Sequence, residues 1–453
     1  MTEPLELVLE RAAQLVSPTP QEESQVLALA DRLLSQVRGQ AEPLGAEVML
    51  GGSVAKGTWL RGEADIDIFV RFPPDLSRER LEELGLEVAT RALEPHPIRL
   101  RYAEHPYVES TVDGVRVNVV PCYNVKPGQW KSIADRSPYH TEFIRERLTD
   151  EGRREVRLLK AFLKTHGLYG AEIEVEGFSG LVCEILILHY GSFLQTLRSI
   201  SEWRWGQTIA LQGAVEGPPT RPVKIRILDP VDDRRDLGAA ISRRQIARFI
   251  MAARAFLRSP SVAHFEASRP EPLTVLRNSP LIPHLAVAVI KHEAKSEDVL
   301  WGELKRTLRH LGNQLRQEGF QVYRMGVSSD RREASALLFL LENTLLPMWR
   351  VKRGPEATMR EACNRFLAEN LGRALTIWVD EDGRLEALHP RRHRSAEAVL
   401  RELLARGLGV APGLQRAIRS FEIFVGPQVF EAVHRFPWVA HDAARLCAGE
   451  QSL

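Results

Sequence analysis

The sequence predicts an α+β protein of several domains, and three observations lead to this fold class. Its 453 residues are too many for one compact core, so roughly two to four domains are expected. The first third mixes helical periodicity with short alternating strands, the middle is helical, and strands return beyond a loop-rich stretch at 260–280. We therefore expect a mixed head with a small sheet at 1–150, a helical central domain at 151–265, and a mixed α/β C-terminal body and tail at 266–453.

The composition is that of an ordinary globular protein, with 44% hydrophobic residues, 26% charged residues and a net charge of +2. No apolar run approaches the ~20 residues of a membrane span, and the acidic, amphipathic N-terminal segment does not resemble a signal peptide. These features favour a cytoplasmic location and no membrane partner. The four cysteines lack metal-site spacing, so we expect reduced thiols.

The first 150 residues combine helices with a small sheet. A helix is expected at 3–16, and a second should begin at Thr19, because Pro20 and Glu22 follow it as in a capping box. Alternation of apolar and polar residues predicts four strands, at 46–50, 65–72, 99–103 and 115–120.

The rest of the chain is first helical and then mixed. From Arg153 one helix face is apolar and the other carries Lys160, and a single long apolar helix is expected over 181–194. A strand at 224–228 and a helix at 242–257 follow. Three further strands are expected at 285–290, 320–326 and 334–342.

The stretch GGSVAKGTWLRGEADIDIF, residues 51–69, places paired carboxylates downstream of bare backbone and a hydroxyl. Alternate side chains of a strand share a face, so Asp65 and Asp67 point the same way. Neighbouring carboxylates repel each other, and Mg²⁺ removes this penalty while keeping bonds to substrate phosphates. The Gly-Gly turn lets a polyphosphate approach the backbone, and Ser53 adds a donor. The stretch predicts a site for a metal-bound nucleoside triphosphate.

This ordered combination resembles the signature of the DNA polymerase β superfamily of nucleotidyltransferases. Six further stretches follow it in the sequence: RYAEHPYVES, VNVVPCY, DRSPYHTEF, EVRLLKAFLKTHGLYGAE, GFSGLVCEILILHYGSF and LDPVDDRRDLGAA. Together with the first stretch they resemble the archaeal-type, class I CCA-adding enzymes, in family order over residues 50 to about 260, and weaker similarity continues to the end of the chain. The resemblance implies a polymerase β-like head and a tRNA nucleotidyltransferase that builds the 3′ CCA end from CTP and ATP without a nucleic-acid template, releasing pyrophosphate.

The resemblance also implies roles for single residues. Two Mg²⁺ ions, which Mn²⁺ can replace, would be bound by the catalytic residues Asp65, Asp67 and Asn118. The nucleotide would be held by Gly52, Ser53, Lys56, Ser137, His140, Lys160, Tyr169 and Arg235. Asp229 would support base recognition by Arg235, whose planar fork suits either cytosine or adenine. The tRNA acceptor end would contact Tyr102, Glu104, His105 and Arg136. Without the resemblance, Lys160 would be interpreted as solvated, the histidines as ordinary loop residues and Tyr169 as core.

Asn118 departs from the family pattern, which has an aspartate at this position of V-D-V-V-P-C-Y. Its amide oxygen can contact a metal, but it lacks the charge and cannot help to deprotonate a hydroxyl. Chemistry would slow roughly tenfold for each 1.4 kcal/mol of metal stabilisation that is lost. Asn118 is explained by an engineered trap, by a tolerated natural variant, or by a protein that binds RNA without catalysis.

The C-terminal part contains candidates for contacts with the TΨC arm side of tRNA, which an enzyme acting on every tRNA would recognise by shape. The candidates are Arg350, Lys352, Arg353, Arg391, Arg392, His393, Arg394, Trp349 and Trp378. Surface arginine clusters are common in any protein, and the alternating strand around Trp378 favours core packing for that residue.

Three other functions compete with CCA addition. The first is a catalytically impaired tRNA 3′-end binding protein, which Asn118 motivates. The second is another polymerase β-like nucleotidyltransferase, such as an oligoadenylate or cyclic-nucleotide synthase. The third is a scaffolding role, for which the sequence offers no positive indication. Enzymes of the resembling family are often dimers, so a homodimer is one expectation.

Overall fold

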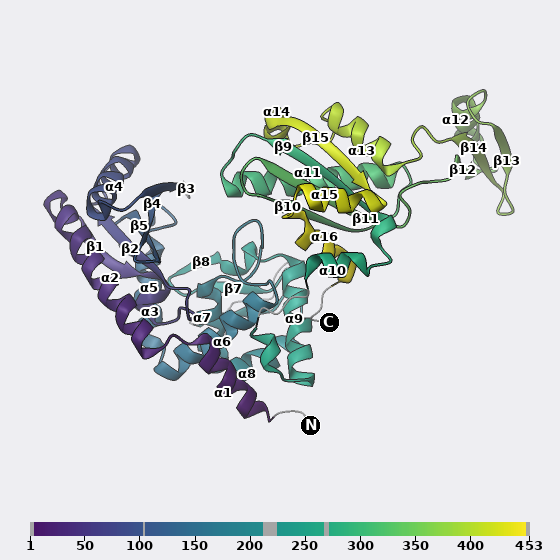
Figure 1. Ribbon diagram of the computed structural model, residues 1–453. Helices are drawn as coiled ribbons and strands as arrows, with labels where there is room; N and C mark the ends of the chain where they lie inside the picture. The colour runs from purple at the N-terminus through teal and green to yellow at the C-terminus, as the bar shows by residue number, and fades with distance from the viewer. Residues whose placement is uncertain (1–3, 103–104, 212–223, 267–270, 450–453) are drawn as a thin grey trace. The chain divides into compact units, whose positions relative to one another are not determined.

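The computed structural model describes residues 4–102, 105–211, 224–266 and 271–449, and Figure 1 labels the helices and strands. The chain forms two compact units, divided between residues 268 and 269. It combines several mixed or antiparallel sheets with many helices, which confirms the α+β class. The finer division into three domains stays a prediction.

A five-stranded sheet forms the head of the first unit, in the order β1-β2-β5-β4-β3. The strands are β1 (Glu47–Gly51), β2 (Asp65–Phe72), β3 (Ile98–Tyr102), β4 (Pro106–Val112) and β5 (Val115–Tyr123). β2 runs parallel to β5, and the other pairs are antiparallel. Helices α2 (Pro20–Ala41) and α4 (Arg78–Leu93) share a buried core with Ile66, Ile68 and Val70 of β2. The opposite face of β2 therefore remains for Asp65 and Asp67.

The head confirms most of its predicted elements. β2 has the predicted bounds, and the Thr19 side chain accepts a hydrogen bond from the Glu22 backbone N–H at 3.2 Å at the start of α2. The Glu22 carboxylate does not close a capping box; it accepts the Gly62 N–H at 2.7 Å. β4 was not predicted, and β5 continues through Pro121. Pro121 is tolerated because it lies beyond the part of β5 that pairs with β4.

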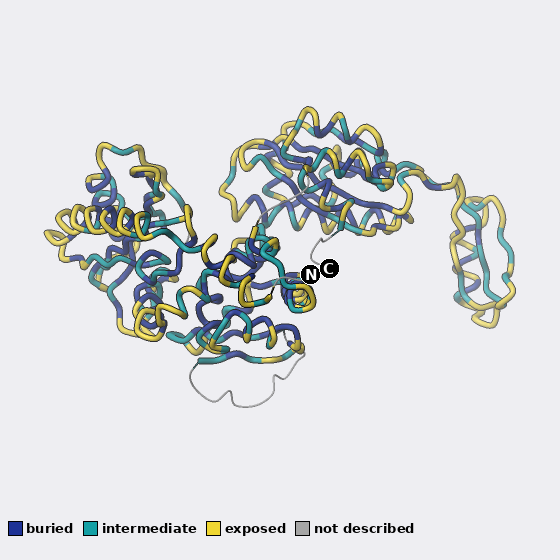
Figure 2. The backbone as a smooth tube through the Cα atoms, turned by 60° about the horizontal axis from the view of Figure 1, so that its bottom comes forward, coloured by how far each residue is buried: buried dark blue, intermediate teal, exposed yellow. Residues whose placement is uncertain are grey.

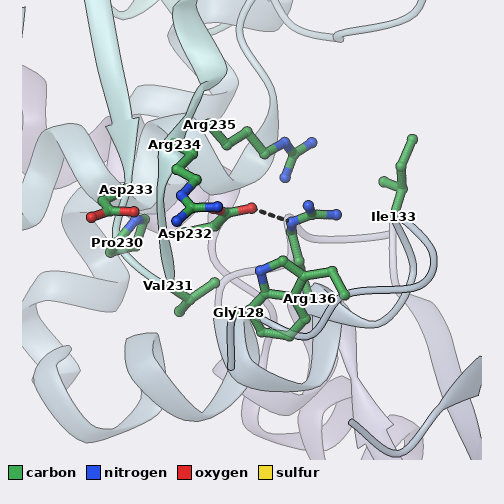
Figure 3. Close-up of a pocket in the computed structure, with 10 residues that line it drawn as sticks. Gly128, Ile133, Arg136, Pro230, Val231, Asp232, Asp233, Arg234 and Arg235 are labelled. Atoms are coloured by element: carbon green, nitrogen blue, oxygen red, sulfur yellow. Dashed lines mark hydrogen bonds and ion pairs between the residues drawn. The ribbon is translucent and has the colours of Figure 1, made fainter. Parts of the chain in front are cut away.

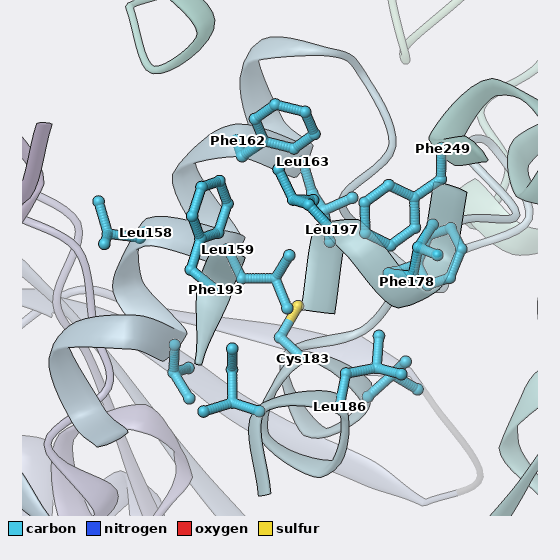
Figure 4. Packing of buried hydrophobic residues seen from close by; sticks show 14 of the residues in the cluster. Leu158, Leu159, Phe162, Leu163, Phe178, Cys183, Leu186, Phe193, Leu197 and Phe249 are labelled. Atoms are coloured by element: carbon cyan, nitrogen blue, oxygen red, sulfur yellow. The ribbon is translucent and has the colours of Figure 1, made fainter. Parts of the chain in front are cut away.

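The remainder of the first unit is mainly helical. Its helices are α1 (Leu5–Val16), α5 (Arg136–Arg147), α6 (Asp150–Thr165), α7 (Gly180–Tyr190), α8 (Phe193–Ser201) and α9 (Arg243–Arg258). A short sheet contains β6 (Thr208–Ile209), β7 (Arg226–Asp229) and β8 (Asp232–Asp236). Figure 4 shows the core between the helices, where Phe162, Phe178, Phe193 and Phe249 pack together.

The single long helix predicted at 181–194 is wrong. α7 ends at Tyr190, Gly191 adopts a φ of +92°, and the Ser192 side chain caps α8 by accepting the Gln195 N–H. A positive φ suits glycine and cannot continue a right-handed helix. No single described helix is long and apolar enough to cross a membrane, although α7 and α8, bent by 92°, meet the length and composition criteria as a pair.

The second unit contains a four-stranded antiparallel sheet in the order β10-β11-β9-β15 and a three-stranded sheet in the order β12-β14-β13. The strands are β9 (Leu285–His292), β10 (Val322–Ser329), β11 (Ala334–Leu341), β12 (Trp349–Glu356), β13 (Thr376–Val379), β14 (Arg384–Pro390) and β15 (Ile418–Val425). The helices are α10 (Pro272–Arg277), α11 (Glu297–Gln317), α12 (Arg360–Asn370), α13 (Ala396–Ala405), α14 (Pro412–Ala417), α15 (Val429–Arg435) and α16 (Val439–Ala448).

The larger sheet of the second unit is covered on both faces. One face packs against α11, α13 and α14, and the other against α10, α15 and α16. This explains why β11 is buried along its whole length. Figure 2 shows the inner strands of this unit in dark blue, the colour of buried residues. The strands predicted at 285–290, 320–326 and 334–342 are confirmed as β9, β10 and β11. Trp378 is half-buried in β13 and lies outside the buried hydrophobic clusters of the described residues, so its predicted core packing is wrong.

Candidate active site

The paired carboxylates of β2 lie beside two hydrogen-bond donors of β5. The parallel register places Arg116 opposite Asp65 and Asn118 opposite Asp67. Arg116 donates to both oxygens of Asp65, with Nε at 2.7 Å from Oδ1, and Asn118 Nδ2 donates to Asp67 Oδ1 at 2.9 Å. We call these four residues the acidic edge. Each carboxylate therefore already has a partner from the neighbouring strand.

The Gly-Gly turn lies directly against this edge. Gly52 has a φ of +65°, and a Cβ on it would lie 1.9 Å from Asp67 Oδ2, so the position requires glycine. Burial raises the pKa of the Asp67 carboxyl, and the hydrogen bond from Asn118 opposes part of this effect. A carboxylate in this environment is one that a bound cation would stabilise.

The acidic edge has the donor atoms for a divalent metal ion. Asn118 Oδ1 is buried and has no hydrogen-bond partner in the described structure. Together with the oxygens of Asp65 and Asp67, it supplies the ligand type that Mg²⁺ prefers. The described residues contain no group of three or more His, Cys, Asp or Glu able to hold a metal ion. The residues thus fit a divalent ion, but with two charged ligands and one amide.

A second charged cluster follows the same turn and is buried. Glu184 of α7 accepts hydrogen bonds from Lys56 Nζ at 2.6 Å and from Thr58 Oγ1 at 2.7 Å. Lys160 Nζ lies 3.4 Å from Glu184 Oε1 and donates to the backbone oxygen and Oγ1 of Thr58, each at 3.0 Å. We call these four residues the lysine cluster. The interpretation of Lys160 as a solvated helix residue is wrong.

Burial and charge act in opposite directions in the lysine cluster. Burial lowers the pKa of Lys160, which the neighbouring Glu184 carboxylate opposes. Burial alone would raise the pKa of Glu184, but the charges of Lys56 and Lys160 and the hydrogen bonds from Lys56 and Thr58 together lower it. Glu184 and Thr58 were missed in the sequence. A lone glutamate in the apolar run LVCEILIL was the available indication, because a buried charge needs a partner.

Two predicted nucleotide-binding residues, His140 and Arg235, form one network with Asp229, the predicted support for base recognition. His140 Nε2 lies 2.8 Å and 3.0 Å from the two carboxylate oxygens of Asp229, and Arg235 Nη1 donates to Asp229 Oδ2 at 3.1 Å. Burial is the largest single effect and would raise the pKa of Asp229, but the contacts with His140, the Val231 N–H and Arg235 together lower it. Asp229 therefore orients the Arg235 guanidinium, which is the arrangement that a base-reading arginine needs.

A pocket of about 780 Å³ adjoins this network and is drawn in Figure 3. Arg136, Arg235 and the turn between β7 and β8 line it. Arg136 Nε donates to Asp232 Oδ2 at 2.8 Å, and its guanidinium lies 5.3 Å from the centre of the Trp130 ring. A polar, partly aromatic pocket of this size can hold a nucleotide base.

Known families match all three parts of the chain. The matched models are a nucleotidyltransferase domain over 31–140, the second domain of tRNA nucleotidyltransferase over 154–266, and the C-terminal domain of CCA-adding enzyme over 284–426. A CCA-adding enzyme of Methanopyrus kandleri is 39% identical over 428 residues, which cover 88% of this chain and 86% of the relative. The chain belongs to the CCA-adding enzyme family. Another member, from Archaeoglobus fulgidus, is 35% identical and covers 94% of this chain and 96% of its own length.

The remaining predicted nucleotide-binding residues of this CCA-adding family member are Tyr169, Ser53 and Ser137. Tyr169 converges with Lys160 on the start of α7, because a Cβ on Gly180 would lie 3.0 Å from the Tyr169 hydroxyl and 3.4 Å from Lys160 Nζ. Burial raises the pKa of Tyr169. Ser53 lies in α3 (Gly52–Lys56), and Ser137 lies in the first turn of α5.

The predicted acceptor-end residues are less concentrated. His105 is buried, with Nδ1 at 3.2 Å from Glu82 Oε1 of α4, while its Nε2 has no hydrogen-bond partner among the described residues. Tyr102 ends β3, and Glu104 lies outside the described residues. Among the described members of this group, Arg136 is the one that lines the pocket.

The C-terminal candidates of this family member differ in how firmly the fold holds them. Arg391 donates to the Glu318 carbonyl at 2.8 Å and Arg394 to the Leu346 carbonyl at 3.2 Å. Arg392 and His393 pair with Glu402. The residues of β12 are more exposed: Trp349 is 40% exposed, and Arg350, Lys352 and Arg353 are exposed in the same strand. Lys352 pairs with Glu369, and Arg353 pairs with Glu386.

Proposed function

We propose that this protein adds or repairs the 3′-terminal CCA of tRNA, using CTP and ATP and no nucleic-acid template. The observation that carries this proposal is the combination of the acidic edge, the lysine cluster and the Asp229–Arg235 pair within one unit. The first supplies metal ligands, the second supplies charge for a triphosphate, and the third supplies a base-reading guanidinium. The names of the relatives support tRNA as the substrate.

The chain's own residues would divide the work of phosphoryl transfer. Asp65, Asp67 and Asn118 would hold divalent ions, either Mg²⁺ or Mn²⁺. Such ions would lower the pKa of the tRNA 3′ hydroxyl and neutralise phosphate charge. Lys56 and Lys160 add positive charge beside the triphosphate. The nucleotide would also be contacted by the Gly52 backbone, the Ser53 hydroxyl and the Arg235 guanidinium, and by Ser137, His140 and Tyr169. Arg136 would contact the acceptor end of the tRNA. Pyrophosphate leaves, and no side chain acts as a nucleophile.

The remaining partners extend the same proposal. β12, with Trp349 and three basic residues exposed, would contact the TΨC arm side of tRNA by stacking and phosphate contacts. A homodimer and a cytoplasmic location belong to the proposal as family expectations.

The test is incorporation of labelled CTP and ATP into tRNA lacking its 3′ CCA, with Mg²⁺, for the protein and its Asn118→Asp variant. Incorporation by either protein supports CCA addition. Tight tRNA binding with no incorporation by either, even at high Mn²⁺, would instead support the RNA-binding alternative that Asn118 suggests. Products formed from ATP without RNA would point to an oligoadenylate synthase.

A further inference from the structure

The lysine cluster holds more positive than negative charge. The side chains of Lys56 and Lys160 are 9% and 4% exposed, and within the described structure both pair with a single carboxylate, that of Glu184, which is 0% exposed. Removing an ion from water costs free energy unless a counter-ion is close. One carboxylate cannot balance two ammonium groups, so the cluster is matched to a further anion.

Glu184 also fixes where the two ammonium groups lie. Its two oxygens contact different partners: Oε2 accepts from Lys56, while Oε1 accepts from Thr58 and approaches Lys160. Lys160 donates in turn to the carbonyl of Thr58. Three segments that are far apart in the chain, the α3 turn, α6 and α7, therefore meet at one carboxylate.

The surplus charge lies next to the acidic edge. Lys56 ends α3, the helix that begins at the Gly-Gly turn. Gly52, in the same turn, approaches Asp67 closely. An anion with metal-bound phosphates would thus meet the lysine charge on one side of the turn and the carboxylates on the other.

We propose that Glu184 is a positioning residue for the triphosphate, which holds Lys56 and Lys160 so that their surplus charge meets the phosphates of CTP or ATP. This inference rests on the proposed function, in that it places a nucleoside triphosphate at the glycine turn. It adds that the cluster selects by phosphate number, because an excess positive charge stabilises a triphosphate more than a monophosphate.

Binding of CTP and of CMP to the full-length protein, measured by calorimetry with Mg²⁺ and without tRNA, tests the role of Glu184. Two explanations predict opposite signs for Glu184→Gln. If Glu184 only competed with the phosphates, its neutralisation would tighten CTP binding. If Glu184 positions the lysines, CTP binding weakens about tenfold while CMP binding is nearly unchanged. Glu63→Gln is the matched control, because Glu63 pairs at an exposed site with Lys164 of α6, the helix that also carries Lys160. We expect this variant to leave the affinities for CTP and CMP unchanged.

Thr58→Val keeps the test informative if Glu184→Gln fails to fold. It removes the hydroxyl that joins Glu184 to Lys160 but keeps every charge, and we expect a loss of CTP affinity of about threefold. Unchanged or tighter CTP binding in the folded variants, with normal CTP binding by the parent protein, would overturn the positioning role alone. A parent protein that binds CTP no better than CMP would overturn this inference and the proposed function together.

Discussion

Two charged clusters adjoin the same glycine turn, and they differ in exposure. In the acidic edge, the Asp65 side chain is 34% exposed and that of Arg116 is 54% exposed. In the lysine cluster, the paired side chains of Lys56, Lys160 and Glu184 are at most 9% exposed. The first pair is in contact with water, whereas the second group is enclosed by α6 and α7.

This difference indicates different roles during ligand binding. An exposed ion pair contributes about 0–1 kcal/mol, so Arg116 can be displaced from Asp65 at little cost. Breaking a buried pair by removing one partner costs about 3–5 kcal/mol, so the lysine cluster should keep its geometry. We infer that a metal-bound nucleotide rearranges the acidic edge against a fixed lysine cluster.

The largest effect on activity is expected at Asp67. Asp67→Asn removes one of two charged metal ligands and should slow CTP incorporation by about a thousandfold, roughly 4 kcal/mol of transition-state stabilisation. Single-turnover incorporation into tRNA lacking CCA measures this change. Because an asparagine can still accept the hydrogen bond from Asn118, the fold should be preserved. A variant within threefold of the parent rate would show that the acidic edge is not the catalytic centre.

The largest effect on stability is expected at Glu184. Glu184→Ala leaves two buried ammonium groups without their carboxylate counter-ion and should lower the free energy of unfolding by about 3–5 kcal/mol. Asp65→Ala leaves only the exposed Arg116 and should change it by about 1 kcal/mol or less. Urea unfolding followed by circular dichroism compares the two variants in the same unit of the chain. Equal losses of unfolding free energy in the two variants would mean that the lysine cluster is held no more firmly than the acidic edge.

The two clusters also differ in how far the sequence predicts them. Alternation alone places Asp65 and Asp67 on one face of β2, and the structure has the predicted strand bounds. The family resemblance selected Lys56 and Lys160, but not the carboxylate between them. Glu184 is separated from Lys56 by 128 positions, and local periodicity carries no information about such a contact.

Register explains the other omissions. The role of Arg116 depends on which residue of β5 lies opposite Asp65, and a parallel pairing across 51 positions is set by packing rather than by local pattern. β4 was missed because it begins at a proline and places polar residues on its open face. In α6, the helical pattern was recognised, but the packing of α7 over Lys160 was not predictable from it.

The departure at Asn118 predicts a gain of activity on restoring the carboxylate. Asn118→Asp adds a charged ligand, and we expect CTP incorporation to rise about tenfold or more, with less Mg²⁺ needed for half-maximal rate. A titration of the rate with Mg²⁺ separates tighter metal binding from faster chemistry. An unchanged or slower rate would mean that the amide is adapted to this site and that its hydrogen bond to Asp67 is needed.

Arg116 gives the smallest effect and the sharpest test of rearrangement in the acidic edge. Arg116→Gln frees Asp65 from its bidentate partner and should tighten Mn²⁺ binding roughly two- to fivefold, which corresponds to about 0.4–1 kcal/mol for an exposed pair. Free Mn²⁺ measured by electron paramagnetic resonance reports the affinity without any turnover.

Arg101→Gln is the matched control for this measurement. Arg101 lies in β3 and pairs with Glu109 of β4 at 2.9 Å, so its loss removes the same charge from the sheet without freeing Asp65. If both variants tighten Mn²⁺ binding equally, general charge repulsion is responsible and Arg116 has no special place. If only Arg116→Gln tightens Mn²⁺ binding, Arg116 competes with the metal ion for the Asp65 carboxylate. This is the behaviour expected of an exposed ion pair that a metal ion displaces.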